Sequence, residues 1–276
     1  MQFRSKRVAA IHDLSCFGRS SLAVIIPLFS KMNIQVCPLP TALLSTHGAY
    51  QNGTYLDLTD QMIPIMKHWK DIKVEFDVIY PGFLGSGKQI DIVLKFIEDF
   101  KTNNPIVVVD PVMGDEGKLY SIIDSSIVSK MEDLVKKAHI ITPNTTEAAV
   151  LLKREYMPYM DENEAKKIMF ELSELGPEVV ILTSIHGHDK KSRYTGLYNS
   201  KTGEYFFDSC RYFPNDYPGT GDAFTSIFIG ALLNGYTYKN ALKKTLNIIE
   251  ELLEATETSD TPIEDGIKLE SVSITF

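Results

Sequence analysis

Two glycines and an acidic residue stand directly before a helical pattern late in the chain, in the segment Pro218-Gly-Thr-Gly-Asp-Ala-Phe224. The apolar residues that follow recur at helical spacing, at Phe224, Ile227, Phe228, Ala231 and Leu232. Backbone N–H groups at a helix start are accessible and the helix dipole adds positive potential, so Gly219, Thr220 and Gly221 predict an anion site suited to phosphate. Asp222 could then take a proton from a substrate hydroxyl during phosphoryl transfer. The alternative is an ordinary capping turn, in which Asp222 only complements the dipole.

Two further polar segments each follow a short apolar run: Asp110-Pro-Val-Met-Gly114 and Thr142-Pro-Asn-Thr-Thr-Glu147. A carboxylate at Asp110, next to a Val-rich run, would be costly to bury without a partner. Asn144 and Glu147 are three residues apart on an expected helix and so point the same way. Hard oxygen ligands of this kind suit magnesium held largely through water and phosphate. The alternatives are a turn residue before proline at Asp110, and a helix capping box at Asn144 and Glu147.

Short apolar runs that alternate with helical patterns must position these groups. The β-branched runs, which predict buried parallel strands, are Val8–Ile11, Ile34–Val36, Val78–Tyr80, Ile106–Val109, His139–Ile141 and Val179–Leu182. The helical patterns between them cover about 19–32, 58–69, 86–102, 124–137, 144–153 and 162–175. This alternation predicts an α/β fold, with a mostly parallel sheet covered by helices on both faces. Ligands bind beyond the carboxyl ends of such strands, where the polar residues stand.

The pattern changes after Thr183. Residues 193–198 and 204–208 flank a turn-prone stretch and predict a small antiparallel hairpin. A loop at 211–218 leads to two strong helices at about 220–235 and 238–256. No low-complexity linker divides the chain, so residues 1–276 are expected to form a single domain.

Composition excludes several classes of protein. The 276 residues are 44% hydrophobic and 23% charged, which is ordinary globular composition, and the net charge is −8. We found no basic run that would favour a nucleic-acid or membrane partner, no apolar stretch of membrane-spanning length and no signal-peptide core. Three cysteines without metal-ligand spacing (Cys16, Cys37 and Cys210) favour a reduced, cytoplasmic setting.

The three polar segments together resemble the signatures of the ribokinase-like kinases. Gly219–Asp222 resembles that family's glycine-rich motif, Asp110–Gly114 its D-P-V-x-G, and Thr142–Glu147 its T-P-N-x-x-E, in the same order along the chain. The resemblance implies a ribokinase-like three-layer α/β/α fold, ATP as phosphoryl donor and Asp222 as catalytic base. It also implies that Asp110, Asn144 and Glu147 bind the magnesium–nucleotide, with Asp110 and Glu147 holding Mg²⁺ partly through water.

The first third of the chain resembles the pyridoxal kinases within this family. Ala10–Ser21 is similar to their opening, Cys37–Tyr50 to the P-L-x-T-x-x-x-S-N-H segment that lines their vitamin pocket, and Pro81–Ser86 to their G-Y-L-G-S turn. The resemblance implies phosphorylation of the primary hydroxyl of a vitamin B6 compound (pyridoxal, pyridoxine or pyridoxamine). The residues expected to line the acceptor site are Asp13, Thr41, His47 and Phe83.

Four departures from the pyridoxal kinase pattern leave the preferred vitamer open. Asp13 replaces the usual Ser, Phe83 the usual Tyr, Thr46 the usual Asn, and Gly48 the usual Thr. A carboxylate at Asp13 still suits a pyridine ring, because a charge-assisted hydrogen bond is strong. One alternative is a hydroxymethylpyrimidine or other small-alcohol kinase of the same fold, whose glycine motif usually ends in Cys. Another is a non-catalytic vitamin-binding relative, which would lack Asp222 or the Gly-Thr-Gly turn.

The resemblance also carries weaker expectations. Thr183 and Ser184, at the end of a strand, are similar to the family's contact with the nucleotide phosphates. Residues 211–217 form either a lid over ATP or a fixed connection. Relatives of this architecture are commonly homodimers, and the need for a monovalent cation is left open.

Overall fold

The computed structural model describes residues 4–188, 193–209 and 211–274. The chain forms two compact units. The first combines Met1–Ile79 with Phe213–Phe276, and the second is Tyr80–Tyr212. Among the described residues, no helix combines the length and the apolar character that a membrane span requires.

The first unit is built on a long parallel strand pair. Strand β1 (Arg7–Phe17) pairs in parallel with β2 (Gln35–Thr46), and β2 pairs antiparallel with the short β3 (Tyr55–Asp57). The predicted runs, Val8–Ile11 and Ile34–Val36, cover only the beginnings of β1 and β2. Asp13 and Thr41 therefore lie within strands, and β1 shifts register between His12 and Leu14. Polar residues in β1 and two prolines in β2 obscured these extensions, and β3 was not predicted.

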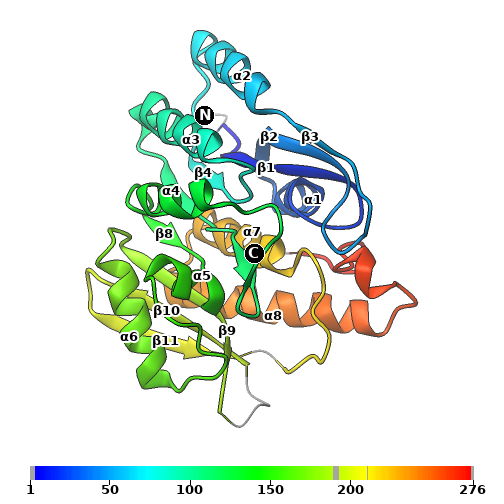
Figure 1. The fold of residues 1–276 in the computed structure, drawn as a ribbon, viewed down its shortest axis with the longest axis vertical. Helices are drawn as coiled ribbons and strands as arrows, with labels where there is room; N and C mark the ends of the chain where they lie inside the picture. Colours follow the sequence, from blue (N-terminus) through cyan, green and yellow to red (C-terminus); the bar gives the residue numbers. More distant parts are fainter. Residues whose placement is uncertain (1–3, 189–192, 210, 275–276) are drawn as a thin grey trace. The chain divides into compact units, whose positions relative to one another are not determined.

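Four helices complete the first unit: α1 (Leu22–Lys31), α2 (Thr59–Asp71), α7 (Thr220–Leu233) and α8 (Tyr238–Glu257), with a 3-10 turn η2 (Ile263–Asp265). Figure 1 shows α1 beside β1 and β2. The prediction that α7 is amphipathic was wrong, because every residue from Ala223 to Ala231 is buried. Helix α7 packs against both α1 and α8, so it has no exposed face over this stretch.

The second unit holds the remaining strands. Strand β4 (Val78–Pro81) enters it from the first unit, and β5 (Ile106–Val109), β8 (Ile140–Ile141) and β9 (Val179–His186) run parallel to one another. Strands β10 (Arg193–Asn199) and β11 (Glu204–Asp208) form the predicted antiparallel hairpin, and β10 pairs antiparallel with β9. A two-stranded ribbon, β6 (Gly114–Asp115) with β7 (Lys118–Leu119), was not predicted.

The helices of the second unit are α3 (Gly87–Asp99), α4 (Ser125–Val135), α5 (Thr145–Leu151) and α6 (Glu162–Ser173), with a 3-10 turn η1 (Lys101–Asn103). Each α-helix begins at a polar residue whose side chain accepts a backbone N–H hydrogen bond, namely Ser86, Asp124, Asn144 and Asp161. These caps satisfy donors that the first helical turn leaves open, which explains where the helices start.

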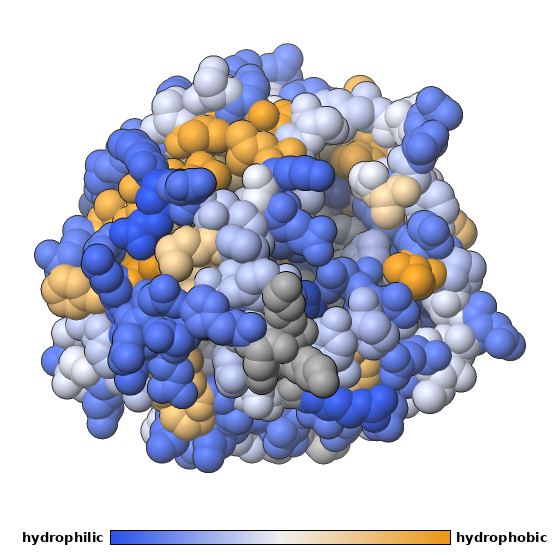
Figure 2. Space-filling view, turned by 60° about the horizontal axis from the view of Figure 1, so that its bottom comes forward, coloured by the Kyte–Doolittle hydropathy of each residue, from blue (hydrophilic) through white to orange (hydrophobic). Residues whose placement is uncertain are grey.

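The strands carry the cores of both units. Residues Val8–Ile11 of β1 and Val179–Leu182 of β9 are fully buried, as the continuous apolar runs predicted. The mostly parallel α/β fold with a small hairpin is therefore confirmed. The surface face in Figure 2 is largely hydrophilic with apolar patches between, which is ordinary for a folded protein.

Candidate active site

Helix α7 begins with an open turn. Gly219 is the N-cap residue with φ 82°, and a Cβ atom there would lie 2.4 Å from the carbonyl oxygen of Arg19. Only glycine fits this left-handed, closely approached position. A Cβ at Gly221 would meet no atom within 4 Å, and no side chain of the described residues caps the helix. Thr220 donates its N–H and its hydroxyl to the Tyr217 carbonyl. The amides of the next residues thus remain for an anion.

The Asp222 carboxylate is largely buried beside this turn, with its side chain 12% exposed. Its Oδ2 accepts the backbone N–H of Ser21 at 2.7 Å, and its Oδ1 lies 3.8 Å from Nδ1 of His12. Burial raises the pKa of Asp222 to about 7, the Ser21 N–H opposes this rise, and the charge of Asp13 adds to it. A carboxyl group with this pKa can exchange a proton near neutral pH.

Asp13 is the second buried acid of the first unit and is 5% exposed. Its Oδ1 accepts the Ser21 hydroxyl hydrogen bond and its Oδ2 that of Ser15 at 3.2 Å. Burial raises the pKa of Asp13, whereas the two hydroxyl donors lower it. Ser21 therefore hydrogen-bonds to both acids, through its backbone to Asp222 and through its side chain to Asp13.

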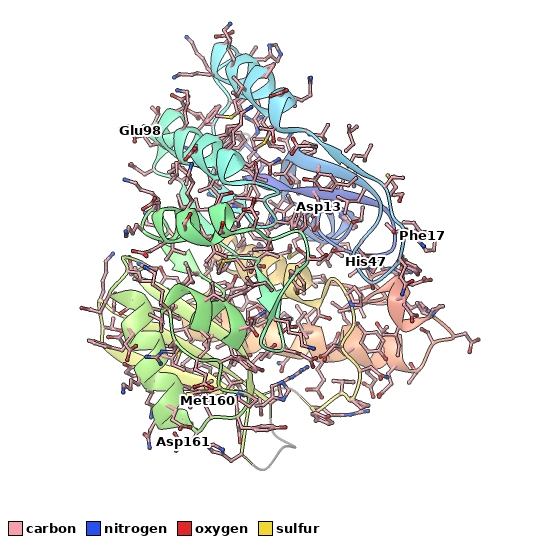
Figure 3. The ribbon with its side chains drawn as sticks, in the orientation of Figure 1. Asp13, Phe17, His47, Glu98, Met160 and Asp161 are labelled. Carbon is pink, nitrogen blue, oxygen red and sulfur yellow. The ribbon has the colours of Figure 1, made fainter. Side chains whose placement is uncertain are left out.

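His47 lies after β2 in the same unit, and Figure 3 labels it with Asp13 and Phe17. Its ring is buried against Gly18, where a Cβ would come within 2.4 Å of Nε2, and its Nδ1 accepts the Ala49 N–H at 3.3 Å. Burial lowers the pKa of His47, which favours the neutral ring at pH 7. Thr41, also expected at the acceptor site, is fully buried within β2.

The Asp265 carboxylate lies near His47 and accepts a hydrogen bond from the loop that follows β2. The Tyr50 hydroxyl donates to Asp265 of η2, and this hydrogen bond raises the pKa of Tyr50 to about 12. The Tyr50 ring in turn lies 5.4 Å from the His47 ring, measured between centroids. Asp265 could not be predicted as a partner of Tyr50, because the two residues are 215 positions apart in the sequence.

In the second unit, Asn144 and Glu147 form the capping box that was one of the two interpretations. Asn144 Oδ1 accepts the Glu147 N–H at 2.9 Å, and Glu147 Oε2 accepts the Asn144 N–H at 2.9 Å. Glu147 Oε1 also accepts the Met113 N–H at 3.1 Å, and Asn144 Nδ2 donates to the Gly114 carbonyl at 2.8 Å. The box therefore ties α5 to the segment after β5, and both carboxylate oxygens of Glu147 already accept one bond.

Asp110 and Glu147 form a buried acidic pair, 8% and 4% exposed. Burial, and then the charge of Asp110, raise the pKa of Glu147 well above its usual range. A nearby cation would relieve this cost. The described residues hold no cluster of three or more His, Cys, Asp or Glu able to form a protein-only metal site. Two hard oxygen donors and no full cage fit Mg²⁺, which keeps waters and phosphate ligands.

Three further expected residues belong to the second unit. Thr183 donates its N–H and hydroxyl to the Pro143 carbonyl, at 2.9 and 3.3 Å. Ser184 has φ 55° inside β9, which continues to His186 instead of ending at a turn after Leu182. A left-handed non-glycine residue stores strain, which is often found at functional sites. Phe83 is half-buried after β4, and its role stays a prediction.

The loop at 211–217 has mixed exposure: Phe213 and Tyr217 are buried and Tyr212 is 47% exposed. Of the three aromatic residues of this loop, only Tyr212 is exposed. The lid hypothesis stays a prediction.

Sequence reasoning gave no role to His12, Ser15 or Ser21, although all three lie in the segment that resembled the pyridoxal kinases. His12 is fully buried beside Asp222. A signal for Ser21 was present, since it follows Gly18-Arg-Ser at the start of a helical pattern. Its hydrogen bond to Asp222 spans 201 residues and could not be read from spacing.

Residues 59–265 match the phosphomethylpyrimidine kinase family, which covers well over half of the chain. The chain belongs to this family. A pyridoxal kinase PdxY from Actinobacillus succinogenes is 28% identical over 260 residues, covering 91% of this chain and 89% of that relative. The crystal structure of pyridoxal kinase from Lactobacillus plantarum is 28% identical with a TM-score of 0.86, covering 97% of this chain and 95% of that one.

A more similar structure comes from Bacteroides thetaiotaomicron. That protein, assigned as a phosphomethylpyrimidine kinase and crystallised in one form with pyridoxal, is 44% identical with a TM-score of 0.93. The match covers 97% of this chain and 94% of that one. These likenesses confirm the ribokinase-like fold, and with the family they confirm that the chain is an ATP-dependent small-molecule kinase of the pyridoxal kinase type.

Proposed function

We propose that this kinase transfers the γ-phosphoryl group of ATP to the primary hydroxyl of a B6 vitamer and gives the 5′-phosphate. The observation that carries the proposal is the Asp222 carboxyl group. It lies at the open N-terminal turn of α7, and burial raises its pKa to about 7. A group that is half-ionised near neutral pH suits a base for an alcohol.

In this reaction Asp222 takes the proton of the attacking hydroxyl. The N-terminal turn of α7, formed by Gly219, Thr220 and Gly221, presents the backbone amides that follow Thr220 and the positive end of the helix dipole to the transferring phosphoryl group. Phosphoryl transfer needs mainly positioning and charge stabilisation, which this turn supplies without a covalent intermediate.

The acceptor ring is assigned to the first unit's buried polar residues. Asp13, held by two serine hydroxyls, accepts a hydrogen bond from the ring N–H or a ring hydroxyl, and this bond is charge-assisted when the carboxyl group is ionised. His47, whose lowered pKa favours the neutral ring, is assigned to the same ring-binding site. Thr41 and Phe83 are the remaining residues that we assign to ring binding.

We assign MgATP to Asp110, Asn144, Glu147, Thr183 and Ser184. Asp110 and Glu147 would hold Mg²⁺, partly through water, and the ion would supply charge neutralisation for the phosphate oxygens. Asn144 fixes Glu147 through the capping box, so the buried carboxylate has one orientation. Ser184 has a left-handed backbone, which turns its peptide groups away from the directions of a regular strand. We assign this residue to the nucleotide phosphates.

Two features favour a B6 vitamer over a hydroxymethylpyrimidine. Asp222 stands where the pyrimidine kinases usually carry Cys. The Bacteroides relative, 44% identical, was crystallised with pyridoxal. The family description names a pyrimidine substrate, so hydroxymethylpyrimidine is the competing acceptor.

An acceptor panel tests the proposal. Purified protein with ATP and Mg²⁺ is given pyridoxal, pyridoxine, pyridoxamine or hydroxymethylpyrimidine, and ADP release and product mass are measured. We expect the highest kcat/KM with one of the three B6 vitamers. A higher kcat/KM with hydroxymethylpyrimidine would overturn the substrate assignment, and binding of pyridoxal without transfer to any acceptor would identify a non-catalytic relative.

We also propose that residues 1–276 form a single functional domain and that the protein is a cytoplasmic homodimer. Residues 211–217 are proposed to form a lid. Sedimentation of the purified protein tests the dimer. Protease cleavage within 211–217 with and without ATP tests the lid, because closure over the nucleotide would protect that loop.

A further inference from the structure

Ser21 adopts a backbone conformation that favours glycine. Its φ is 49° and its ψ is −128°, and the carbonyl of Ser20 accepts the N–H of Ala23 at 3.1 Å. These values match the first central position of a type II′ turn, where a positive φ makes glycine the preferred residue. A serine held there is strained, and such strain persists only where the surrounding structure imposes it.

The contacts of Ser21 show what imposes the strain. Its backbone N–H donates to Asp222 Oδ2 at 2.7 Å, and its hydroxyl donates to Asp13 Oδ1. Asp13 lies on β1 and Asp222 on α7, so one residue joins acids from two elements. Ser21 itself is 5% exposed, which leaves its hydrogen bonds little competition from water.

A glycine at this position would relax the turn and keep the N–H to Asp222. What glycine cannot supply is the hydroxyl to Asp13. The side chain therefore accounts for a serine at a position where the backbone alone would favour glycine.

We propose that Ser21 is a positioning residue of the kinase reaction, which holds the Asp13 and Asp222 carboxylates in one fixed arrangement through its hydroxyl and its N–H. The inference rests on the proposed function, in which Asp222 is the base and Asp13 orients the acceptor ring. Ser21 acts through these two acids and not on the substrate itself.

Loss of the hydroxyl has a defined effect on the pH dependence. The Ser21 hydrogen bond lowers the pKa of Asp13, so its removal lets Asp13 keep a proton to higher pH. The other ionisable groups near the two acids, among the described residues, are His12 on β1, His47 after β2 and Tyr55 on β3. None of them is altered by the substitution. Because an Asp13 that keeps its proton no longer raises the pKa of Asp222, the acid limb of kcat/KM for pyridoxal should move to lower pH.

Three variants test the proposal: Ser21→Gly, Ser21→Ala, and Ser20→Ala as the matched neighbouring control. Ser21→Gly relieves the strain and deletes the hydroxyl, whereas Ser21→Ala deletes the hydroxyl and keeps the strain. We expect both Ser21 variants to lose about tenfold in kcat/KM, the scale of one hydrogen bond to a charged group, and to show the shifted acid limb. Ser21→Gly should unfold at or above the wild-type Tm, Ser21→Ala below Ser21→Gly, and Ser20→Ala should match wild type throughout.

Two results would overturn the proposal. One is a wild-type kcat/KM and pH profile in both Ser21 variants, and the other is a Tm for Ser21→Gly clearly below that of wild type. A failure of the proposed function appears differently, as a wild-type protein that phosphorylates no B6 vitamer; the Ser21 proposal then falls with it. Active wild type with unaffected variants rejects the Ser21 proposal alone.

Discussion

At the scale of single residues, Asp222 meets two opposing demands. Folding favours its protonated form, because burial penalises the charge, whereas its proposed role as a base requires the ionised form. A pKa of about 7 is where these demands balance. In the proposed role, the ionised form of Asp222 lowers the stability of the fold and makes the group able to act as a base. Both effects can be measured.

The pH dependence of turnover measures the ability of Asp222 to act as a base. Because Asp222 must lose its proton and its pKa is about 7, kcat/KM should rise with pH through roughly neutral pH and level off above it. Steady-state rates with saturating MgATP from pH 5.5 to 9 report this limb. A rate that is flat across neutral pH would contradict the assignment of Asp222 as the base.

The stability of the Asp222→Asn variant measures how much the buried charge of Asp222 destabilises the fold. The folded pKa of about 7 lies above the ordinary value of 3.8, so between these pH values the folded state binds more protons than the unfolded state. The contribution of Asp222 to wild-type stability should therefore fall as pH rises from about 4 to 7, by at most about 4 kcal/mol.

Asn cannot ionise and can still accept the Ser21 N–H, so the variant should lack this loss. We expect Asp222→Asn to have the higher Tm at pH 8, with the difference shrinking toward pH 4. Thermal unfolding at both pH values checks the result. Equal Tm values at pH 8 would mean that the carboxylate is not under strain in the fold.

Residue types in the motifs were predictable, but their contacts were not. Asp222, Asp13 and His47 were each named from the sequence, and the structure places all three in the first unit. Ser21 could be placed at a helix start from the sequence, but its left-handed backbone and its hydrogen bonds to two acids could not be predicted from spacing or composition. Asp110 and Glu147 were predicted as two ligands. The sequence did not show that they lie close enough for the charge of Asp110 to raise the pKa of Glu147.

At the scale of elements, the two ends of α7 offer a matched pair of glycines. Gly219 and Gly235 have similar positive φ values of 82° and 86°, but a Cβ meets the Arg19 carbonyl at Gly219 and nothing within 4 Å at Gly235. Gly235→Ala should cost about 1 kcal/mol from backbone strain alone. Gly219→Ala adds a clash and should displace the turn that we propose to face the phosphate.

We therefore expect a larger loss of stability for Gly219→Ala, and at least a tenfold fall in kcat that Gly235→Ala does not show. Urea unfolding and steady-state kinetics on both variants check these effects. Equal kcat values for the two variants would show that the α7 turn does not contribute to the reaction.

The matching capping boxes of α5 and α6 allow the effect of losing a helix cap to be distinguished from the effect of losing a nucleotide-binding residue. Asn144 and Asp161 make the same pair of cap hydrogen bonds, with Glu147 and Glu164 as their partners. Asn144→Ala and Asp161→Ala should each cost about 1 kcal/mol of stability. Because only Asn144 orients a proposed Mg²⁺ ligand, only its variant should raise KM for MgATP severalfold. A similar KM in the two variants would leave Asn144 as a cap alone.

Element positions were largely predictable because apolar runs and caps are local signals. All eight α-helices of the described chain fall within a few residues of their expected ranges. The later parts of β1 and β2 were missed because His12 and Asp13 interrupt the apolar run of β1, and Pro38 and Pro40 follow the run predicted for β2. Polar residues and prolines within a strand therefore made the ends of these strands hard to predict.

At the scale of the whole molecule, the proposed groups divide between the two compact units. The first unit holds the base, the α7 turn and most of the acceptor residues, and the second holds the proposed MgATP ligands. A net charge of −8 gives anionic ATP no general attraction, so its binding must depend on local groups, for which we propose the α7 turn and Mg²⁺ on the buried acids. Nucleotide affinity should accordingly be insensitive to changes confined to the base.

The most direct test of the account is a comparison of wild type with Asp222→Asn in single-turnover phosphoryl transfer from MgATP to pyridoxal, with the Kd for ATP measured on both proteins. The account expects transfer to slow by about 10²- to 10⁴-fold, the usual contribution of a general base, while the ATP Kd changes by less than about threefold. Transfer at a rate close to wild type in Asp222→Asn would contradict the central claim.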